Sequence, residues 1–256
     1  MKQKIVASIE ARMTSSRLPG KVLLEAGGRP MLGHLVERLR RVPSVEKIVL
    51  ATTTNAADED LVSFAEDAGI ACFRGDEGDV MRRVIGAAES VETDILVKFT
   101  GDCPIVDPAI VEQCVRMFLH NACDYVSNGH IPSYPVGMGV QVLRLETLVR
   151  SAEMTDDVAD REHVTLHIRN HPELFRHLYL IAPADMQWPE LRLTLDEQPD
   201  YRLIKQVIEY YAETNPWFGC RDVVELLRAK KDWVTDDNLK PTKSSRYQHL
   251  PIGGSG

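Results

Sequence analysis

Short apolar runs alternate with amphipathic segments over the first 120 residues of the chain. The apolar runs have the length of buried β-strands and lie at residues 5–9, 47–53, 70–73 and 94–99. The segments between them carry apolar side chains at helical spacing, at residues 31–39, 58–68 and 80–90. Strands that alternate with helices form βαβ units with parallel strands. We therefore predict an α/β fold with a mixed, mostly parallel sheet flanked by helices.

From about residue 124 the pattern becomes less regular. Further strands are predicted at residues 124–128, 139–143, 176–181 and 192–195. Further helices are predicted at residues 145–152, 160–171, 199–211 and 222–229. We assign residues 1–235 to a single domain, in which about residues 124–190 form a subregion. Residues 236–256 form a polar C-terminal tail that ends in a linker-like Gly-Gly-Ser-Gly.

Composition excludes several classes of protein. The 256 residues are 44% hydrophobic and 27% charged, as in ordinary soluble domains. The net charge of −8 argues against nucleic-acid binding, which needs a basic face. The sequence shows neither a hydrophobic signal core nor an apolar run near the roughly 20 residues that span a bilayer, so a cytoplasmic protein without membrane contact is expected. Five scattered cysteines without a C-x-x-C pair indicate reduced thiols rather than disulfides or zinc ligands.

A basic loop follows the first predicted strand. It carries Arg12, Arg17 and Lys21 among small hydroxyl residues, and residues 1–21 hold five cations against one acid. Cations and exposed backbone N–H groups beyond a strand end suit a polyphosphate. The loop matches neither the P-loop pattern nor G-x-G-x-x-G. A solvated basic turn is the competing interpretation, and the position after the first strand favours phosphate binding.

Polar residues follow all four predicted parallel strands, at residues 12–21, 52–55, 74–79 and 100–102. The carboxyl ends of such strands meet at one edge of the sheet, where ligands bind. Asp102 follows a buried strand, and Asp196 ends the predicted strand at 192–195. Either acid alone fits a turn or a helix cap. Together, beside a polyphosphate loop, they suit Mg²⁺-assisted phosphoryl or nucleotidyl transfer, whereas Asp200 fits the start of the next helix.

The segment Arg161-Glu162-His163 places three ionisable groups in a row. On a helix, consecutive side chains point about 100° apart, so the three cannot all face one ligand. Arg161 or His163 could bind an anionic acceptor, but the residues alone favour a structural histidine. The sequence contains no H-E-x-x-H motif and no nucleophile with a neighbouring base, which disfavours covalent catalysis.

Residues 11–21, Ala-Arg-Met-Thr-Ser-Ser-Arg-Leu-Pro-Gly-Lys, resemble the signature loop of bacterial sugar-acid cytidylyltransferases. This family includes the acylneuraminate and 3-deoxy-manno-octulosonate cytidylyltransferases, and the match is nearest to the branch named after the spore coat polysaccharide biosynthesis protein SpsF. Further matches appear in family order, across about residues 4–230, at 73–75 with 79–80, 100–104, 124–128, 161–165 and 192–196.

The resemblance implies a Rossmann-like nucleotide-diphospho-sugar transferase fold of the glycosyltransferase-A (GT-A) type. It implies a reaction in which CTP and an anionic sugar acid give a CMP-activated product and pyrophosphate, with Mg²⁺ as cofactor. It also implies surface-polysaccharide biosynthesis and a homodimer in which the region after residue 124 reaches the partner.

The resemblance also assigns roles by position. Residues expected to hold the nucleotide and its triphosphate are Ala11, Arg12, Ser15, Arg17, Lys21 and Thr100. Residues expected on the nucleotide and acceptor side are Arg74 and Asp79. Asp102 and Asp196 are the expected Mg²⁺ ligands, and catalysis is assigned to Arg12, Arg17, Lys21 and Asp102. Residues expected near the acceptor are Tyr134, Pro135, Gly137, Arg161 and His163.

Two positions depart from the branch pattern. Glu10 stands where the branch usually has glutamine, and Gln141 stands where it often has glutamate. An acid beside a triphosphate loop repels phosphate unless it faces a cation or a base edge. These exchanges point to base or acceptor contacts that differ from the branch norm.

Two other functions fit the same architecture. A GT-A glycosyltransferase would use a nucleotide-sugar donor and a D-x-D metal motif after the fourth strand, where residues 100–104 offer one acid only. A non-catalytic nucleotide-binding protein would bind CTP without turnover. The predicted function is a CTP-dependent cytidylyltransferase.

Overall fold

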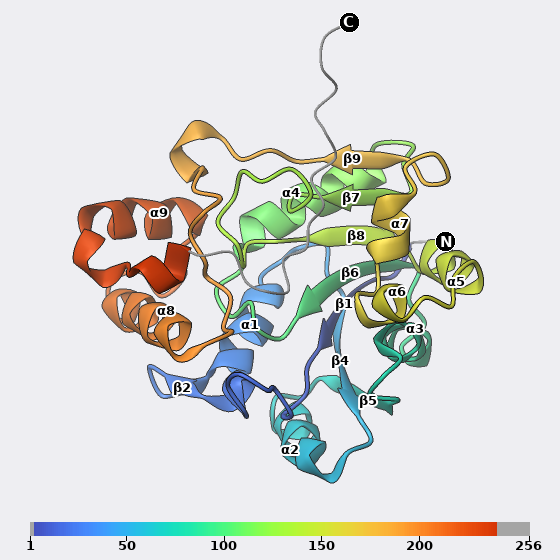
Figure 1. Ribbon diagram of the computed structural model, residues 1–256, viewed down its shortest axis with the longest axis horizontal. Helices are drawn as coiled ribbons and strands as arrows, with labels where there is room; N and C mark the ends of the chain where they lie inside the picture. Colours follow the sequence, from blue (N-terminus) through green and yellow to red (C-terminus); the bar gives the residue numbers. More distant parts are fainter. Residues whose placement is uncertain (1–2, 240–256) are drawn as a thin grey trace, which may run out of the picture.

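A seven-stranded sheet forms the centre of the computed structural model, which describes residues 3–239 (Figure 1). The strand order is β5-β4-β1-β6-β8-β7-β9. The strands are β1 (Ile5–Glu10), β4 (Lys47–Thr53), β5 (Ala71–Gly75), β6 (Ile95–Thr100), β7 (Tyr125–Ser127), β8 (Gln141–Arg144) and β9 (His177–Tyr179). All pairs are parallel except those of β8, which runs antiparallel to β6 and β7. The predicted mixed, mostly parallel sheet is confirmed.

Helices cover both faces of this sheet. They are α1 (Met31–Leu39), α2 (Glu59–Asp67), α3 (Val80–Ser90), α4 (Pro108–Leu119), α5 (Leu145–Glu153), α6 (Val158–Glu162), α7 (Leu166–Asn170), α8 (Gln198–Tyr211) and α9 (Cys220–Ala229). Short 3-10 turns are η1 (Lys21–Leu23), η2 (Ala56–Asp58), η3 (Ala184–Met186), η4 (Lys231–Trp233) and η5 (Asp236–Leu239). A small hairpin of β2 (Glu25–Ala26) and β3 (Arg29–Pro30) precedes α1.

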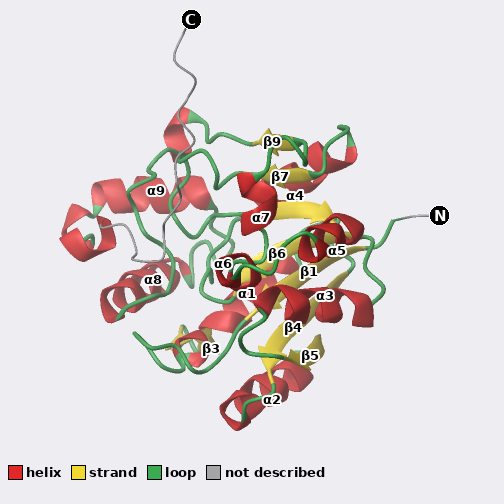
Figure 2. Ribbon diagram, turned by 45° about the vertical axis from the view of Figure 1, so that its right-hand side comes forward, coloured by secondary structure: helices red, strands yellow, loops and turns green. Residues whose placement is uncertain are grey.

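The alternation of side chains along the strands creates two cores. On β1, Ile5, Ala7 and Ile9 face a core built with α1, α2, α4, α8 and α9, whereas Val6 faces a second core built with α3, α5 and α7. Figure 2 shows the sheet between these two helical layers. Because both faces are covered, most side chains of the central strands β1 and β6 are apolar, and a charged side chain buried within such a strand is conspicuous.

Local capping explains where the main helices begin. Asp79 caps α3 by accepting a hydrogen bond from Arg82 N at 2.8 Å. Asp107 caps α4 in the same way, with Pro108 at the first helical position. Glu197 and Asp200 form a reciprocal capping box at the start of α8, which confirms the role predicted for Asp200.

The predicted helix at residues 160–171 is wrong. α6 ends at Glu162 and α7 begins at Leu166, and between them the buried Val164 has a φ of 50°. A β-branched residue is strained in this left-handed region. The break persists because Val164 packs into the second core and the Thr165 hydroxyl donates to Gln141 Oε1 at 2.6 Å. Tertiary contacts therefore override the local helical pattern.

The predicted strand at residues 192–195 is also wrong. This segment makes only an isolated bridge, between Val136 and Arg192, because its backbone N–H groups find partners outside the sheet. Arg192 N donates to Asn238 O at 2.8 Å, and Leu195 N donates to Asp102 O at 2.8 Å. The second of these bonds fixes the segment beside the end of β6, so Asp196 still reaches the edge where the strand prediction placed it.

Other expectations concern the thiols, membranes and the tail. All five cysteines are free thiols, as predicted. None of the helices within residues 3–239 is long and apolar enough to cross a membrane.

The strands β7, β8 and β9 of the 124–190 subregion continue the same sheet as the first half of the chain. Of the predicted tail, residues 236–239 form η5, and the remainder lies outside the described residues.

Candidate active site

Four strand-end loops meet at the carboxyl edge of β5, β4, β1 and β6, as predicted. Within the loop after β1, Ala11 is buried and its N–H donates to Ala51 O on β4 at 3.3 Å, while Ser15 is half-buried. The turn at Gly101 lies against this loop, where a Cβ would stand 2.9 Å from the Ala11 Cβ. Glycine at position 101 therefore lets the loops after β1 and β6 pack together.

Asp58 anchors the loop after β1 to the end of β4. Its Oδ1 accepts from Met13 N at 2.7 Å, and its Oδ2 accepts from the Thr52 and Thr53 hydroxyls and from Thr53 N. Burial alone would raise the pKa of this carboxyl, but these hydrogen bonds outweigh it and lower the pKa. We missed Asp58 in the sequence, where the available signal was an acid shortly after two threonines at a strand end.

Lys21, Arg17, Asp102 and Asp196 form one ionic cluster. Lys21 Nζ lies 3.0 Å from Asp196 Oδ1 and 3.5 Å from Asp102 Oδ2. Arg17 Nη2 lies 3.1 Å from the same Asp196 oxygen. The side chains of Lys21 and Asp196 are only 13% and 8% exposed. The structure thus brings two of the three loop cations together with the two acids that the sequence placed at different strand ends.

The carboxyl of Asp102 is held in its charged form. Burial would raise its pKa, but the charge of Lys21 and hydrogen bonds from Thr100 and Cys103 together lower it. Thr100 Oγ1 donates to Asp102 Oδ1 at 2.5 Å. Burial and the neighbouring Asp102 charge raise the pKa of the Cys103 thiol well above its ordinary value. The thiol therefore stays protonated and is a poor nucleophile.

The two carboxylates fit a metal that arrives with a nucleotide. Residues 3–239 contain no group of three or more His, Cys, Asp or Glu side chains arranged to hold a metal ion on their own. Mg²⁺ commonly binds one or two protein carboxylates and takes its other oxygens from substrate phosphates and water. Asp102 and Asp196, which share the Lys21 ammonium, supply that smaller donor set.

Arg12 lies in a separate group at the same edge. Its Nη1 is 2.9 Å from Glu77 Oε1, which also accepts from the Thr14 hydroxyl at 2.9 Å. Asn55 Nδ2 donates to Glu77 Oε2 at 2.5 Å. These hydrogen bonds, first those from Asn55 and Thr14 and then the contact with Arg12, lower the pKa of Glu77. Glu77, which we also missed, thus joins the loops after β1, β4 and β5.

Arg74 supports the edge of β4. Its Nε donates to Thr53 O and its Nη2 donates to Asn55 O, both at 2.9 Å, and it pairs with Glu59. The structure therefore places this guanidinium against the loop after β4.

Asp79 and Arg161 face each other, with Oδ2 and Nη1 3.6 Å apart. Arg161 Nη2 also donates to Ala152 O at 2.7 Å and to Thr155 O at 2.8 Å. These contacts join α6, which contains Arg161, to the start of α3 and to the end of α5, so Arg161 braces the region that carries His163.

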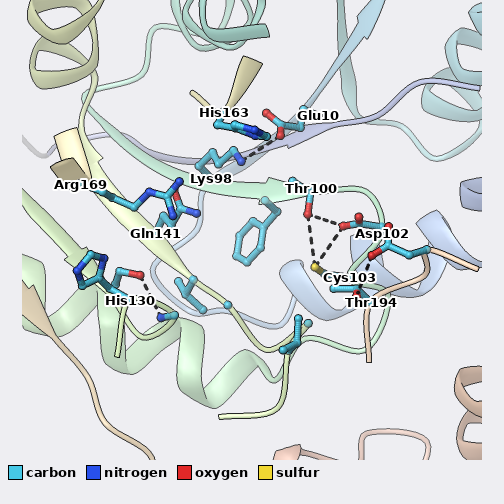
Figure 3. A pocket seen from close by; sticks show the side chains of 18 of the residues that line it. Glu10, Lys98, Thr100, Asp102, Cys103, His130, Gln141, His163, Arg169 and Thr194 are labelled. Carbon is cyan, nitrogen blue, oxygen red and sulfur yellow. Dashed lines mark hydrogen bonds and ion pairs between the residues drawn. The ribbon is translucent and has the colours of Figure 1, made fainter. Parts of the chain in front are cut away.

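A pocket of about 240 Å³ opens beside the ionic cluster. Figure 3 shows Thr100 and Asp102 at one end, Gln141, Arg169 and His130 at the other, and Glu10, Lys98 and His163 along the side between them. Its floor includes a polar row across the sheet, since Lys98 on β6 pairs with Gln141 on β8, which pairs with Ser127 on β7. Among the predicted site residues, those that line this pocket are Thr100, Asp102, Gly137, His163 and Asp196.

Glu10 and Lys98 form a buried ion pair in the wall of this pocket. Lys98 Nζ lies 3.0 Å from Glu10 Oε1, and the two side chains are 7% and 14% exposed. An acid at this position repels phosphate unless it faces a cation, and Glu10 faces Lys98. The sequence did not lead us to predict a role for Lys98. The available signal was the presence of a lysine within the otherwise mostly apolar strand β6.

The segment before β8 closes the pocket. Gly137 has a φ of 105°, and a Cβ there would stand 2.5 Å from Leu193 O, so only glycine fits. Tyr134 packs in the first core, where burial raises the pKa of its hydroxyl to about 12. Pro135 O accepts from Met138 N at 3.1 Å. Tyr134 and Pro135 thus shape the turn, whereas Gly137 reaches the pocket itself.

Comparisons with known proteins agree with this geometry. The family model described as "Cytidylyltransferase" matches residues 6–229. The chain is 34% identical over 239 residues to the spore coat polysaccharide biosynthesis protein SpsF of Bacillus subtilis, covering 91% of this chain and 97% of SpsF. A cytidylyltransferase structure from Leptospira borgpetersenii superposes with a TM-score of 0.86 at 28% identity, covering 94% of this chain and 99% of the other.

A more distant structure shares the fold. The CMP:2-keto-3-deoxy-manno-octonic acid synthetase complexed with CTP has a TM-score of 0.61 at 20% identity, covering 81% of this chain and 99% of the synthetase. The predicted nucleotidyltransferase fold is thereby confirmed. Because the family model spans most of the chain and SpsF is similar over nearly its whole length, the chain belongs to the cytidylyltransferase family and is a CTP-using nucleotidyltransferase.

Proposed function

We propose that this enzyme joins CMP to an anionic sugar acid, with Mg²⁺ as cofactor, in the synthesis of a surface polysaccharide. The observation that carries the proposal is the cluster of Lys21, Arg17, Asp102 and Asp196 at the mouth of a pocket large enough for a sugar. The name of SpsF supports the pathway, and the name of the CTP-bound synthetase supports a sugar acid as acceptor.

The proposed reaction is an in-line displacement at phosphorus. A hydroxyl oxygen of the acceptor attacks the α-phosphorus of CTP, its proton passes to water, and the bond to the β-phosphate breaks to release pyrophosphate. Arg17 and Lys21 neutralise the charge that develops on the triphosphate. Mg²⁺ held by Asp102 and Asp196 would neutralise the leaving pyrophosphate and orient the phosphates.

The ion pairs of the free protein suit this role. Lys21 balances two carboxylates that would otherwise repel each other and the incoming triphosphate. A nucleotide that brings Mg²⁺ would give the carboxylates a new cation and would give Lys21 and Arg17 new anionic partners. The site would therefore exchange one set of ion pairs for another when the substrates bind.

The remaining predicted residues divide into those that touch substrate and those that support them. We propose that Ala11, Arg12, Ser15 and Thr100 face the nucleotide, and that Gly137 and His163 face the acceptor. Arg74, Asp79 and Arg161 act through the loops that they brace. Tyr134 and Pro135 act through the turn that presents Gly137.

A cytoplasmic homodimer with residues 124–190 at the interface completes the proposal, supported by the resemblance of this region to the family. Size-exclusion chromatography with light scattering tests the oligomeric state. A mass of twice the chain supports the dimer, and the mass of a single chain across micromolar concentrations contradicts it.

Pyrophosphate release tests the function. The enzyme is incubated with CTP, UTP, ATP or GTP, with Mg²⁺ or EDTA, and with a panel of sugar acids and phosphonate acceptors. We expect release only with CTP, Mg²⁺ and a sugar acid. Transfer of a sugar from a nucleotide-sugar donor without pyrophosphate, or CTP binding without turnover on any acceptor, would contradict the proposal.

A further inference from the structure

The loop after β1 carries polar groups at two ends of the carboxyl edge. Lys21 contacts Asp102 beyond β6, which places the proposed triphosphate site at that end. Arg12 contacts Glu77, which lies between β5 and α3. The proposed acceptor pocket extends from the ionic cluster toward β8 and β7, and β5 lies on the opposite side of β1 (Figure 1). A nucleotide with its phosphates at the cluster and its acceptor in the pocket has its base against the loops after β1, β4 and β5.

The Glu77 carboxylate is fixed by contacts from these three loops. Its Oε1 accepts from Arg12 Nη1 and from the Thr14 hydroxyl, both at 2.9 Å, and its Oε2 accepts from Asn55 Nδ2 at 2.5 Å. The backbone of Glu77 is held as well, because the buried Arg83 donates through Nη1 to the Glu77 carbonyl oxygen at 3.3 Å. A side chain held in this way is preorganised for recognition of a ligand.

This carboxylate keeps room for one more hydrogen-bond donor. A carboxylate offers about four acceptor positions, and the contacts with Arg12, Thr14 and Asn55 use three of them. The remaining position is on Oε2, which has a single donor. The Glu77 side chain is 38% exposed, so a ligand can reach it. The hydrogen bonds also lower the pKa of Glu77, so at neutral pH its carboxylate is ionised and can only accept.

The local backbone does not explain why an acid stands at position 77. Acids in turns and helix caps accept from backbone N–H groups. The acids of these loops that do so are Asp58, Asp76 and Asp79. Within residues 3–239, Glu77 accepts from side chains only. Its role is therefore different from that of a turn or cap acid.

We propose that Glu77 is a specificity-determining residue that selects cytosine over uracil by accepting a hydrogen bond from the 4-amino group of the base. Carboxylates of Glu and Asp accept from this group of cytosine in protein–nucleic acid contacts. Uracil carries an oxygen at the same position, and that oxygen would face the carboxylate without a hydrogen bond. The inference rests on the proposed function for the placement of the phosphates and the acceptor, and it concerns the base alone.

A binding cycle between Glu77 and the 4-amino group tests this inference. Calorimetric titrations with Mg²⁺ and without acceptor give the dissociation constants of three triphosphates. These are CTP, UTP and the CTP analogue whose base has hydrogen in place of the 4-amino group. In the parent we expect CTP to bind about tenfold more tightly than the analogue, with UTP weaker still.

Two variants remove the carboxylate. In Glu77→Ala, CTP and the analogue should bind within about twofold of each other, because the partner of the amino group is gone. In Glu77→Gln, the preference for CTP over UTP should fall about tenfold, because the amide can donate to the uracil oxygen. Both variants also release Arg12, which affects the three nucleotides alike and cancels in the ratios. Glu66→Gln, an exposed acid on α2, is the matched control and should keep the parent ratios.

The outcomes separate this inference from the proposed function. Equal weakening of CTP, UTP and the analogue in both variants overturns the inference, because Glu77 then only braces the loops. A parent that binds CTP and UTP equally also overturns it. If Glu77→Ala fails to fold in a thermal melt, the UTP and CTP constants of Glu77→Gln decide. Selection of CTP through Glu77, without pyrophosphate release on any acceptor, supports this inference and contradicts the proposed function.

Discussion

The loop after β1 and the pocket beneath α6 and α7 hold their charged side chains in different ways. At the loop, cations and carboxylates from separate strand ends pair with one another, as Lys21 does with Asp102 and Asp196. In the pocket, the buried ion pair of Glu10 and Lys98 stands within two strands, and the covering segment bends at the strained Val164. Exchangeable ion pairs suit a triphosphate that carries its own metal, whereas a fixed polar floor suits selection of one acceptor by shape and charge.

The largest expected effect comes from the acids that join the two regions. Asp102→Asn and Asp196→Asn each remove one of the two proposed metal ligands, and we expect kcat to fall by about 100-fold or more. CTP binding without metal should persist, because the loop cations remain. Pyrophosphate release and calorimetric titration with CTP measure the two effects, with the exposed Asp67→Asn as control. Equal loss of CTP binding and turnover would mean that these acids mainly hold the loop in place.

The next effect separates the nucleotide side from the acceptor side. Asp58→Asn places an amide against the hydrogen-bond donors Thr53 N and Thr53 Oγ1, so the loop after β1 should lose its anchor. We expect the KM for CTP to rise about tenfold and the free energy of unfolding to fall by about 2 kcal/mol. The KM for the acceptor should stay near the parent value. Asp60→Asn, an exposed acid on α2, serves as the matched control. A rise in acceptor KM alone would contradict the separation of the two regions.

The complementary change acts on the acceptor side. Thr165→Val keeps the shape of the side chain but removes the hydroxyl that donates to Gln141, and the turn that carries His163 should loosen. We expect the acceptor KM to rise by about fivefold, equivalent to about 1 kcal/mol, with the KM for CTP unchanged. Thr165→Ser retains the hydroxyl and should behave like the parent. If both threonine variants behave alike, the hydrogen bond does not position the pocket.

The smallest expected effect is a pH dependence of stability that comes from Asp58, the anchor of the loop after β1. The pKa of Asp58 is lower in the folded protein than in the unfolded chain. The contribution of Asp58 to the free energy of unfolding is therefore present above its pKa in the unfolded chain. That contribution is lost as the pH falls toward its pKa in the folded protein. The parent should lose more stability between about pH 5 and pH 3 than Asp58→Asn does. Urea unfolding at several pH values measures this, and parallel curves for the two proteins would contradict it.

The first half of the fold could be predicted because its signals are local. The apolar spacing of residues 80–90 and the capping Asp79 define α3 without help from the rest of the chain. The meeting of the strand-end loops at one edge was predicted from the parallel arrangement of the strands. The resemblance of the loop after β1 to the family's signature loop identified the nucleotide as CTP. The predicted position of Asp196 at this edge is correct, although its segment is not a strand. Hydrogen bonds from Leu193 N and Leu195 N hold the segment in place.

The acceptor side depends on contacts between distant residues, which periodicity does not reveal. The break at Val164 follows from its packing and from the bond between Thr165 and Gln141. Lys98 is buried because Glu10 lies on the neighbouring strand, in a register that only the sheet defines. Asp58 and Glu77 act as anchors through residues of other strand-end loops, and the sequence does not show that these loops are in contact.

The proposed function places the reaction of CTP with a sugar acid, with Mg²⁺ as cofactor, at the cluster of Lys21, Asp102 and Asp196. Phosphorus-31 NMR of the complete reaction tests it most directly, because it observes both products at once. We expect a phosphodiester signal from the CMP-linked acid and a pyrophosphate signal to grow in equal amounts in the parent, and neither to appear with Asp102→Asn or with EDTA. Pyrophosphate without the diester, or both products at the parent rate in Asp102→Asn, would contradict the account.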